Sequence, residues 1–323
     1  MRRELVLFLS ILVAVPVACA PPELGTRRPS RGSSQDQEST AASTTRSKSP
    51  KPSSSTTQQT TAVVAPTPSK GCNGGAEKAP QPSGLSANMT LEVAGSMRSY
   101  DLEVPDGYDP KRAYPVVFVF HASGGTGGNI RTSFKFSDIA SDKALFVYPS
   151  GRNKQWDLDS PAGDNQDIAL FDALTDSLEA TYCIDSARVF ATGFSNGAYF
   201  ANQLGCRRGD RLRAVASHGG GGPYGGDGAY DDDGNLKCVG PSPAALIVHG
   251  QSDMIVPVNN ADASLKHWTW ANDCSGETSE AEPDPCVSFD GCNKPVVSCR
   301  VTALGHSIWS EGTRTTWDFF ASF

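Results

Sequence analysis

The sequence lacks an apolar run of about 20 residues, the length that a helix needs to cross a membrane. It also has few basic residues beyond its first segment. Residues 1–70 contain nine of the 28 Lys and Arg and four of the 35 Asp and Glu. The residues that follow contain 19 Lys and Arg but 31 Asp and Glu, so this larger part is acidic. Such an acidic part does not offer the basic face that nucleic acid requires. These absences favour neutral substrates or neutral polymers.

Ligand patterns for metals and phosphates are also missing. Cys286, Cys292 and Cys299 lie close together, but no CxxC pair or nearby His completes a zinc site around them. The Gly-rich run over 124–128 has neither the Lys nor the spacing of a P-loop. We therefore expect no metal and no other cofactor.

The N-terminus has the pattern of an export signal. Two arginines precede an apolar run that ends at Val17, and a small-residue triplet centred on Cys19 follows, so residues 1–20 are predicted to be a secretory signal. Two routes stay open: removal at an A-x-A site, or a bacterial lipoprotein box that lipidates Cys19, in which Pro16 replaces the usual Leu. Residues 21–70, rich in Ser, Thr, Gln and Pro, are predicted to be a disordered linker. The expected location is extracellular, either secreted or lipid-anchored at the cell surface.

Residues 71–323 show the rhythm of one folded domain. The segments 89–93 and 98–104 predict an antiparallel opening pair, and the apolar run 115–120 predicts a strand that is buried on both faces. Apolar residues at spacings of three and four over 168–178 predict an amphipathic helix. Alternating strands and helices of this kind predict an α/β fold with a mostly parallel central sheet and helices on both faces.

The sharpest motif is a G-x-S-x-G run from Gly193 to Gly197. It follows an apolar strand over 189–192 and precedes a segment over 198–204 that can form a helix, which is the context of a nucleophile elbow. The turn is so tight that flanking side chains would collide, hence the two glycines. Ser195 is therefore the predicted nucleophile, at a helix N-terminus that favours negative charge.

A serine hydroxyl needs a base to accept its proton. In elbow enzymes the order along the chain is Ser, acid, His. His306 lies in a loop after the last predicted strand and is the predicted base. The other histidines that follow Ser195 have less suitable positions, in a Gly-rich run, before the acid or on a helix: His218, His249 and His267.

The acid and the oxyanion donors follow from the same reasoning. Asp253 is the first carboxylate after the strand 244–249 and is the predicted acid, with Asp262 as the fallback. One oxyanion donor is the backbone N–H of Asn196. The second is assigned to Ser123 in the Gly-rich turn, in preference to its two neighbours.

Two tryptophans are candidates for substrate binding. Trp156 lies in a polar loop after the fourth strand, and Trp309 lies three residues after His306. Either ring could stack on a substrate. Simple loop packing is an equally good interpretation for both.

Taken together, these motifs resemble a known family. The segments 120–125, 183–185, 192–197, 249–253 and 305–306 are similar to those of extracellular feruloyl esterases. They equally resemble the related polyhydroxybutyrate depolymerase-like esterases of carbohydrate esterase family one. The resemblance spans roughly residues 70–323 and implies an α/β-hydrolase fold, no metal and ester hydrolysis through an acyl-enzyme. Where many relatives have His-Gly-Cys, this chain has His-Ala-Ser.

Setting Cys19 aside, eight cysteines remain, and this even number in an exported domain predicts four disulfides. The resemblance implies their pairing as Cys72–Cys183, Cys206–Cys238, Cys274–Cys292 and Cys286–Cys299.

The leading hypothesis is a serine esterase that releases hydroxycinnamoyl or acetyl groups from plant cell-wall polysaccharide. The alternatives are a polyhydroxybutyrate depolymerase, a peptidase with the same triad, and a surface-binding protein without catalysis. The expected partner is an ester substrate, attached to polysaccharide or free, and not nucleic acid.

Overall fold

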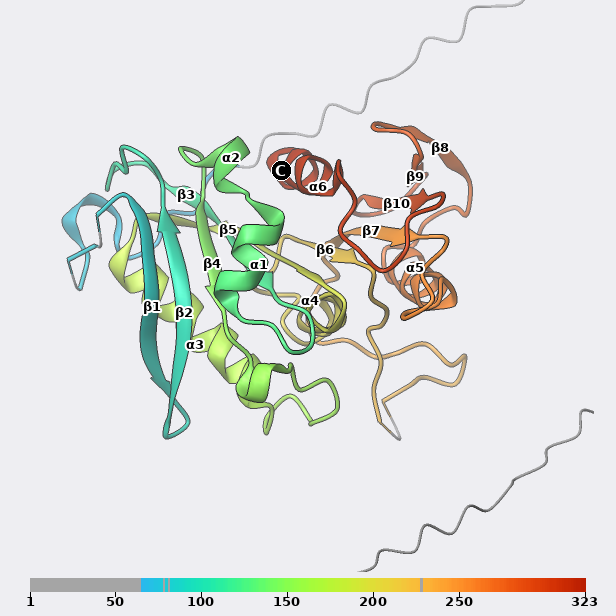
Figure 1. Ribbon diagram of the computed structural model, residues 1–323, viewed down its shortest axis with the longest axis horizontal. Helices are drawn as coiled ribbons and strands as arrows, with labels where there is room; N and C mark the ends of the chain where they lie inside the picture. Colours follow the sequence, from blue (N-terminus) through green and yellow to red (C-terminus); the bar gives the residue numbers. More distant parts are fainter. Residues whose placement is uncertain (1–64, 78, 81, 227–228) are drawn as a thin grey trace, which may run out of the picture. The chain divides into compact units, whose positions relative to one another are not determined.

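The computed structural model describes residues 65–77, 79–80, 82–226 and 229–323, so the predicted signal, Cys19 and most of the predicted linker lie outside the described residues. The described chain forms one ten-stranded sheet of order β1-β2-β4-β3-β5-β6-β7-β10-β9-β8 (Figure 1). The strands are β1 (Gly84–Val93), β2 (Ser96–Val104), β3 (Tyr114–Phe120), β4 (Leu145–Pro149), β5 (Ile184–Phe194), β6 (Ala214–His218), β7 (Ala244–Gly250), β8 (Thr278–Ala281), β9 (Cys286–Phe289) and β10 (Val296–Val301).

The centre of the sheet is parallel and its edges are antiparallel. β4, β3, β5, β6, β7 and β10 pair in parallel, whereas β1 and β2 on one side and β9 and β8 on the other pair antiparallel. The predicted opening pair and the predicted α/β fold class are confirmed. The hairpin of β8 and β9 was not predicted, because both strands have only four residues, β8 is mostly exposed, and neither strand shows a clear apolar alternation.

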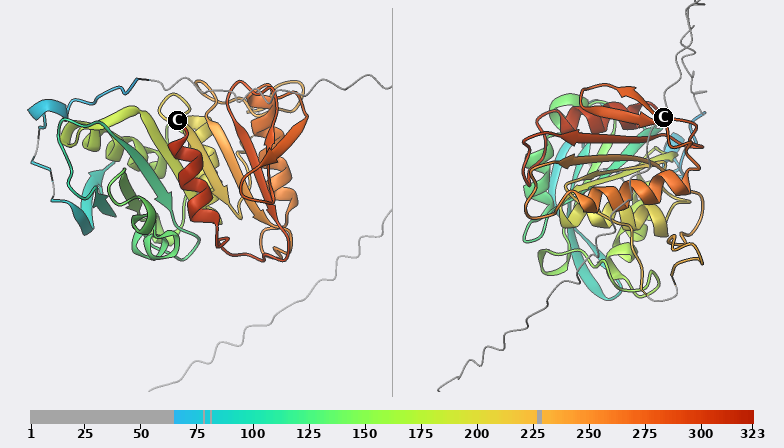
Figure 2. Two further views of the ribbon diagram at one scale, coloured as in Figure 1. Left: turned by 90° about the horizontal axis from the view of Figure 1, so that it is seen from above. Right: turned by 90° about the vertical axis from the view of Figure 1, so that its right-hand side faces the viewer.

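Helices cover both faces of the sheet (Figures 1 and 2). Alternate residues of β3 point to opposite sides: Val116 and Phe118 belong to one apolar cluster, and Val117 and Val119 to the other. The first cluster includes residues of α3 (Gln166–Thr181), α4 (Asn196–Arg207) and α5 (Asn259–Ala271), and the second includes residues of α1 (Gly127–Phe134), α2 (Ser137–Ala140) and α6 (Gly312–Ala321). The sheet is therefore buried between two helical layers, as the wholly apolar central strands require.

The folded unit begins a few residues before the predicted boundary at 71. Thr67 donates its backbone N–H to Asp185 Oδ1 at 2.8 Å, and Ser69 Oγ donates to the Tyr182 carbonyl at 2.7 Å. Among the described residues, no helix is long and apolar enough to span a membrane.

Four disulfides tie loops to this framework, and they are the pairs that the resemblance implied. They join Cys72 to Cys183, Cys206 to Cys238, Cys274 to Cys292 and Cys286 to Cys299. Such cross-links persist in oxidising compartments outside the cytosol. Their sulfurs are bonded to each other and are not thiolate ligands, which includes the Cys206–Cys238 pair beside His267.

Candidate active site

The turn between β5 and α4 has the geometry of a nucleophile elbow. Ser195 has a left-handed φ of 55° and ψ of −121°, a strained conformation for a residue with a side chain. A Cβ at Gly193 would lie 2.4 Å from the Gly197 carbonyl oxygen, and a Cβ at Gly197 would lie 2.2 Å from the Phe120 carbonyl oxygen. The turn can close only with glycine at both positions, and closure presents the Ser195 hydroxyl at the end of β5.

The three residues predicted for the triad meet at the carboxyl edge of the sheet. His306 Nε2 lies 2.9 Å from Ser195 Oγ, and His306 Nδ1 lies 2.7 Å from Asp253 Oδ2. Asp253 follows β7 and His306 follows β10, and these strands are parallel neighbours. This geometry lets the imidazole accept a proton from the hydroxyl while the carboxylate fixes its orientation.

The Asp253 side chain is fully buried, but its carboxylate oxygens form hydrogen bonds with protein groups. Burial by itself raises the pKa of this carboxyl, but hydrogen bonds from His306 and from the backbone N–H groups of Val256 and Ile255 together hold the pKa below its ordinary value. The group is therefore an anion at neutral pH, which is the state that stabilises an imidazolium.

The alternative acid and bases have other partners. Asp262 is exposed and forms an ion pair with Arg300. His218 is fully buried, which lowers its pKa to about 3, and it bonds to Thr316. His249 Nε2 bonds to the Val256 carbonyl and also lies 3.6 Å from Asp253 Oδ2, whereas His267 lies beside Cys238. Of the histidines, His306 alone is hydrogen-bonded to Ser195 within the described part of the chain.

The elbow and the turn after β3 both hold backbone amides that have no acceptor within the described residues. Asn196 is the first residue of α4, so its N–H has no partner inside the helix. In the turn after β3, the N–H groups of Gly124 and Gly125 donate to the carbonyls of Lys154 and Ala122. The described residues provide no acceptor for the N–H of Ser123, which matches the predicted donor, although the same is true of Ala122.

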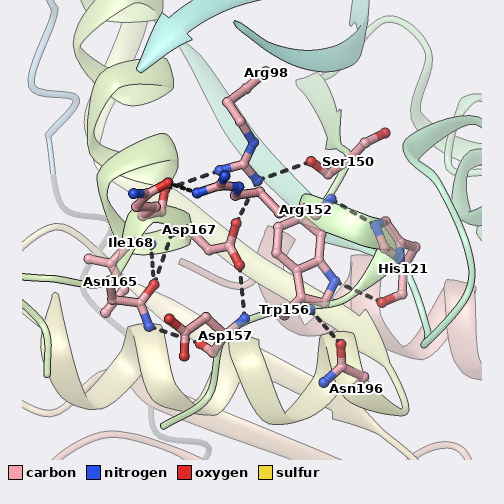
Figure 3. A network of polar contacts seen from close by, with 12 residues as sticks. Arg98, His121, Ser150, Arg152, Trp156, Asp157, Asn165, Asp167, Ile168 and Asn196 are labelled. Carbon is pink, nitrogen blue, oxygen red and sulfur yellow. Dashed lines mark hydrogen bonds and ion pairs between the residues drawn. The ribbon is translucent and has the colours of Figure 1, made fainter. Parts of the chain in front are cut away.

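Of the two interpretations of Trp156, the structure supports packing rather than stacking on a substrate. The residue is only 3% exposed, and its ring packs against Phe200 and Phe120 with centroids 4.9 and 5.0 Å away. Figure 3 shows it instead inside a polar network, where its indole N–H donates to the His121 carbonyl and its backbone N–H donates to Asn196 Oδ1. Trp309 is partly buried against the cluster formed with α6, and its role in binding stays a prediction.

A cavity of about 580 Å³ is lined mainly by α4, α5 and the loop after β6, and no residue of the triad lines it. Tyr199, one turn after Ser195 on α4, lines it together with the loop after β6. That loop begins at Gly219, where a Cβ would lie 3.5 Å from His306 Nδ1. It continues to Gly222 and Pro223, which line the cavity. The remaining lining residues are Leu158, Tyr224, Tyr230, Gly234, Asn235, Leu236, Asn260, Ala263, Lys266 and His267.

Several polar groups of this cavity are hydrogen-bonded within the protein. Tyr199 Oη donates to Asn260 Oδ1 at 2.8 Å, and Asn260 Nδ2 donates to the Pro257 carbonyl at 2.9 Å. Tyr230 Oη accepts from the Gly225 N–H at 3.1 Å. Burial raises the pKa of Tyr224 to about 12, so its phenol is neutral. The rings of Tyr199, Tyr224 and Tyr230 therefore line the cavity together with the polar side chains of Asn235, Lys266 and His267.

The chain is similar in sequence to named esterases, although no protein-family model matches it. It is 31% identical over 222 residues to a probable feruloyl esterase C from Aspergillus clavatus, covering 65% of this chain and 75% of that protein. It is 30% identical over 246 residues to feruloyl esterase C from Emericella nidulans, covering 69% and 83%.

Two solved structures share the fold. An acetyl xylan esterase from Aspergillus awamori has a TM-score of 0.56 at 17% identity, covering 70% of this chain and 94% of that one. A feruloyl esterase module from Clostridium thermocellum, complexed with sinapinate, has a TM-score of 0.52 at 13% identity, covering 83% and 96%. These likenesses confirm the predicted α/β-hydrolase fold.

Proposed function

The chain belongs to the feruloyl esterase C family and is a carboxylic ester hydrolase, and from this premise we propose that it releases hydroxycinnamoyl groups from cell-wall polysaccharide through Ser195, His306 and Asp253. The observation that carries the catalytic assignment is the continuous chain of hydrogen bonds from Asp253 through His306 to the Ser195 hydroxyl. The names of the relatives support the acyl group.

The geometry supports acyl transfer in two halves. His306 Nε2 takes the proton as Ser195 Oγ attacks the ester carbonyl, and the N–H groups of Asn196 and Ser123 donate to the oxyanion that forms. Collapse of this intermediate breaks the bond to the alcohol, which leaves with the proton from His306. Water, deprotonated by the same imidazole, then attacks the acyl-enzyme. The bond between the acyl carbon and Ser195 Oγ breaks, His306 returns the proton to Ser195, and the carboxylic acid is released.

The tyrosine-lined cavity favours an aromatic acyl group over acetyl. Tyr199 lies one helical turn, about 5.4 Å of rise, beyond the nucleophile. A cinnamoyl group bound at Ser195 carries its ring beyond a vinyl spacer and so reaches past the triad toward the cavity, whereas an acetyl group ends beside the carbonyl. Offset or edge contacts with Tyr199 and Tyr224 would hold such a ring, and Lys266 supplies a donor for its oxygens.

We expect the wild type to release ferulate from methyl ferulate and Tyr224→Ala to lower kcat/KM for this ester by roughly tenfold, the scale of one or two lost aromatic contacts. The same variant should hydrolyse p-nitrophenyl acetate within about twofold of wild type, because acetyl does not reach the cavity. Initial rates on both esters measure the ratio.

Met97→Ala is the control, since Met97 is 64% exposed on the β1–β2 hairpin and does not line the cavity. It should leave both rates unchanged. Equal loss on both esters in Tyr224→Ala would contradict the assignment of the cavity, and brisk acetate cleavage without ferulate release in wild type would contradict the proposed substrate.

We place this enzyme outside the cell. Four disulfides in the described residues fit an oxidising compartment, and the acidic balance of the folded part fits a neutral substrate rather than nucleic acid. Attachment through a lipid on Cys19 stays a prediction.

A further inference from the structure

The two oxyanion donors come from segments that are far apart in the sequence. Asn196 begins α4, and Ser123 lies in the turn after β3. Both amides must lie about 2.7–3.1 Å from one oxygen, and a misplacement of about 1 Å can cost two orders of magnitude in rate. Something must therefore fix the separation of the two segments, and backbone pairing of β3 with β5 stops at Phe120 and Gly193, before either donor.

We propose that Trp156 is the positioning residue that holds the two halves of the oxyanion hole together. It contacts both segments at once: its backbone N–H donates to Asn196 Oδ1 at 2.8 Å, and its indole Nε1–H donates to the His121 carbonyl at 2.8 Å (Figure 3). The first bond fixes the residue that carries one donor. The second fixes the peptide that leads into the turn carrying the other.

Further contacts connect the turn after β3 to the loop after β4. Gly151 N–H donates to His121 Nε2 at 2.9 Å, so the proton of this buried imidazole sits on Nδ1 and is donated to the Ala122 carbonyl at 2.8 Å. Ser123 Oγ donates to Gln155 Oε1 at 2.8 Å, and the Gly124 N–H donates to the Lys154 carbonyl. The turn therefore moves only if residues 151–156 move.

A buried ion pair anchors that loop in turn. Arg98 from β2 and Asp167 from the first turn of α3 are 5% and 3% exposed and form a salt bridge. Arg98 also donates to the Ser150 carbonyl, and the Asp157 N–H donates to Asp167 Oδ2 at 2.8 Å. These two side chains therefore hold both ends of the loop that carries Trp156. Removal of either one alone would leave the other as an unpaired buried charge.

The proposal rests on the proposed function and is tested with Trp156→Phe and Asn196→Ala. Phe keeps an aromatic ring against Phe200 but removes the indole N–H, and Ala removes the side-chain acceptor but keeps the backbone donor. We expect each variant to lower kcat by roughly 10- to 100-fold with KM changed less than about threefold, because the donors act on the transition state.

Three readouts separate positioning from simple stability. The loss should be equal for methyl ferulate and p-nitrophenyl acetate, since both form the same oxyanion. The Ki of a trifluoromethyl ketone, whose adduct with Ser195 places an oxyanion in the hole, should rise in proportion to the loss in kcat/KM. The kcat of the double variant should be close to that of the less active single variant, because both substitutions break contacts of the residue at position 156.

Phe171→Leu is the matched control. Phe171 is a buried aromatic residue on α3 that contacts Phe118 and lies outside the network, so this variant should lower Tm while kcat per active site is retained. If Trp156→Phe and Asn196→Ala also lower only Tm, with kcat and Ki unchanged, the proposal is rejected. Loss on methyl ferulate alone would also reject it and would assign Trp156 to substrate binding. Failure of wild type on ferulate would reject the proposed substrate, and the acetate readouts would still decide the role of Trp156.

Discussion

Ser195→Ala is expected to lower kcat/KM toward methyl ferulate by roughly 10⁴- to 10⁶-fold and to leave the fold intact. In the proposed mechanism the hydroxyl forms the acyl-enzyme, and neither Asp253 nor His306 can replace it. Ala tolerates the elbow conformation as Ser does, because both have a single Cβ at a φ of 55°. The His306–Asp253 hydrogen bond does not involve the lost atom. Progress curves, thermal melts and labelling by a fluorophosphonate measure the three consequences: lost turnover, retained Tm and lost labelling.

Ser307→Ala provides the control for this substitution. Ser307 is the exposed neighbour of His306, so its loss tests whether any serine near the base would produce the effect. It should retain activity within about twofold. Fluorophosphonate labelling that persists in Ser195→Ala would show that another residue is the nucleophile and would overturn the assignment.

The meeting of Ser195, Asp253 and His306 could be predicted because their signals are local or follow from topology. The strain at Ser195 requires glycine on both sides, and this leaves the G-x-S-x-G pattern between an apolar strand and a helix. Asp253 and His306 could be placed because parallel strands present their carboxyl ends at one edge, so the loops after β7 and β10 must converge there.

The burial and the contacts of Trp156 could not be predicted in the same way. Its neighbours in sequence are Gln155 and Asp157, which indicate an exposed loop, and the residues that bury it come from β3 and α4. The charges that anchor its loop, Arg98 and Asp167, are 69 positions apart. A polar stretch in the sequence does not reveal that its polar groups will be paired inside the fold.

The aromatic cavity could be predicted from the sequence only in part. Tyr199 lies on the first turn of α4, which begins directly after Ser195, so this wall could have been inferred once α4 was predicted. Tyr224 and Tyr230 belong to an irregular loop after β6 whose path no periodicity describes. Its position depends on contacts such as the Cys206–Cys238 disulfide, which ties the loop back to α4.

Asp253→Asn is expected to lower kcat by about 10⁴-fold at neutral pH although it changes almost no atomic positions. Asp253 Oδ1 accepts the backbone N–H groups of Ile255 and Val256, both at 2.9 Å, and Oδ2 faces His306 Nδ1. In the variant the amide oxygen must stay with the two N–H donors, which leaves the NH₂ group toward His306. The imidazole then accepts at Nδ1 and carries its proton on Nε2, so it cannot accept the proton of Ser195.

The pH dependence of stability should distinguish this variant from wild type. Because the folded-state pKa of Asp253 lies below its ordinary value, the ionised carboxylate stabilises the fold above the unfolded pKa, and this contribution is lost as the pH falls through the folded pKa. The Tm difference between wild type and Asp253→Asn should therefore be present at neutral pH and narrow in acid. Melts from neutral to acid pH test this direction.

Asp262→Asn is the matched control, because it makes the same chemical change at the other candidate acid. Asp262 is exposed and pairs with Arg300, so its variant should keep kcat within about twofold. Fluorophosphonate should still label Asp253→Asn, only slowly, since Ser195 is present but lacks its base. Near-normal turnover in Asp253→Asn, together with lost turnover in Asp262→Asn, would show that Asp262 and not Asp253 orients His306. The loop after β7 would then have no part in the reaction.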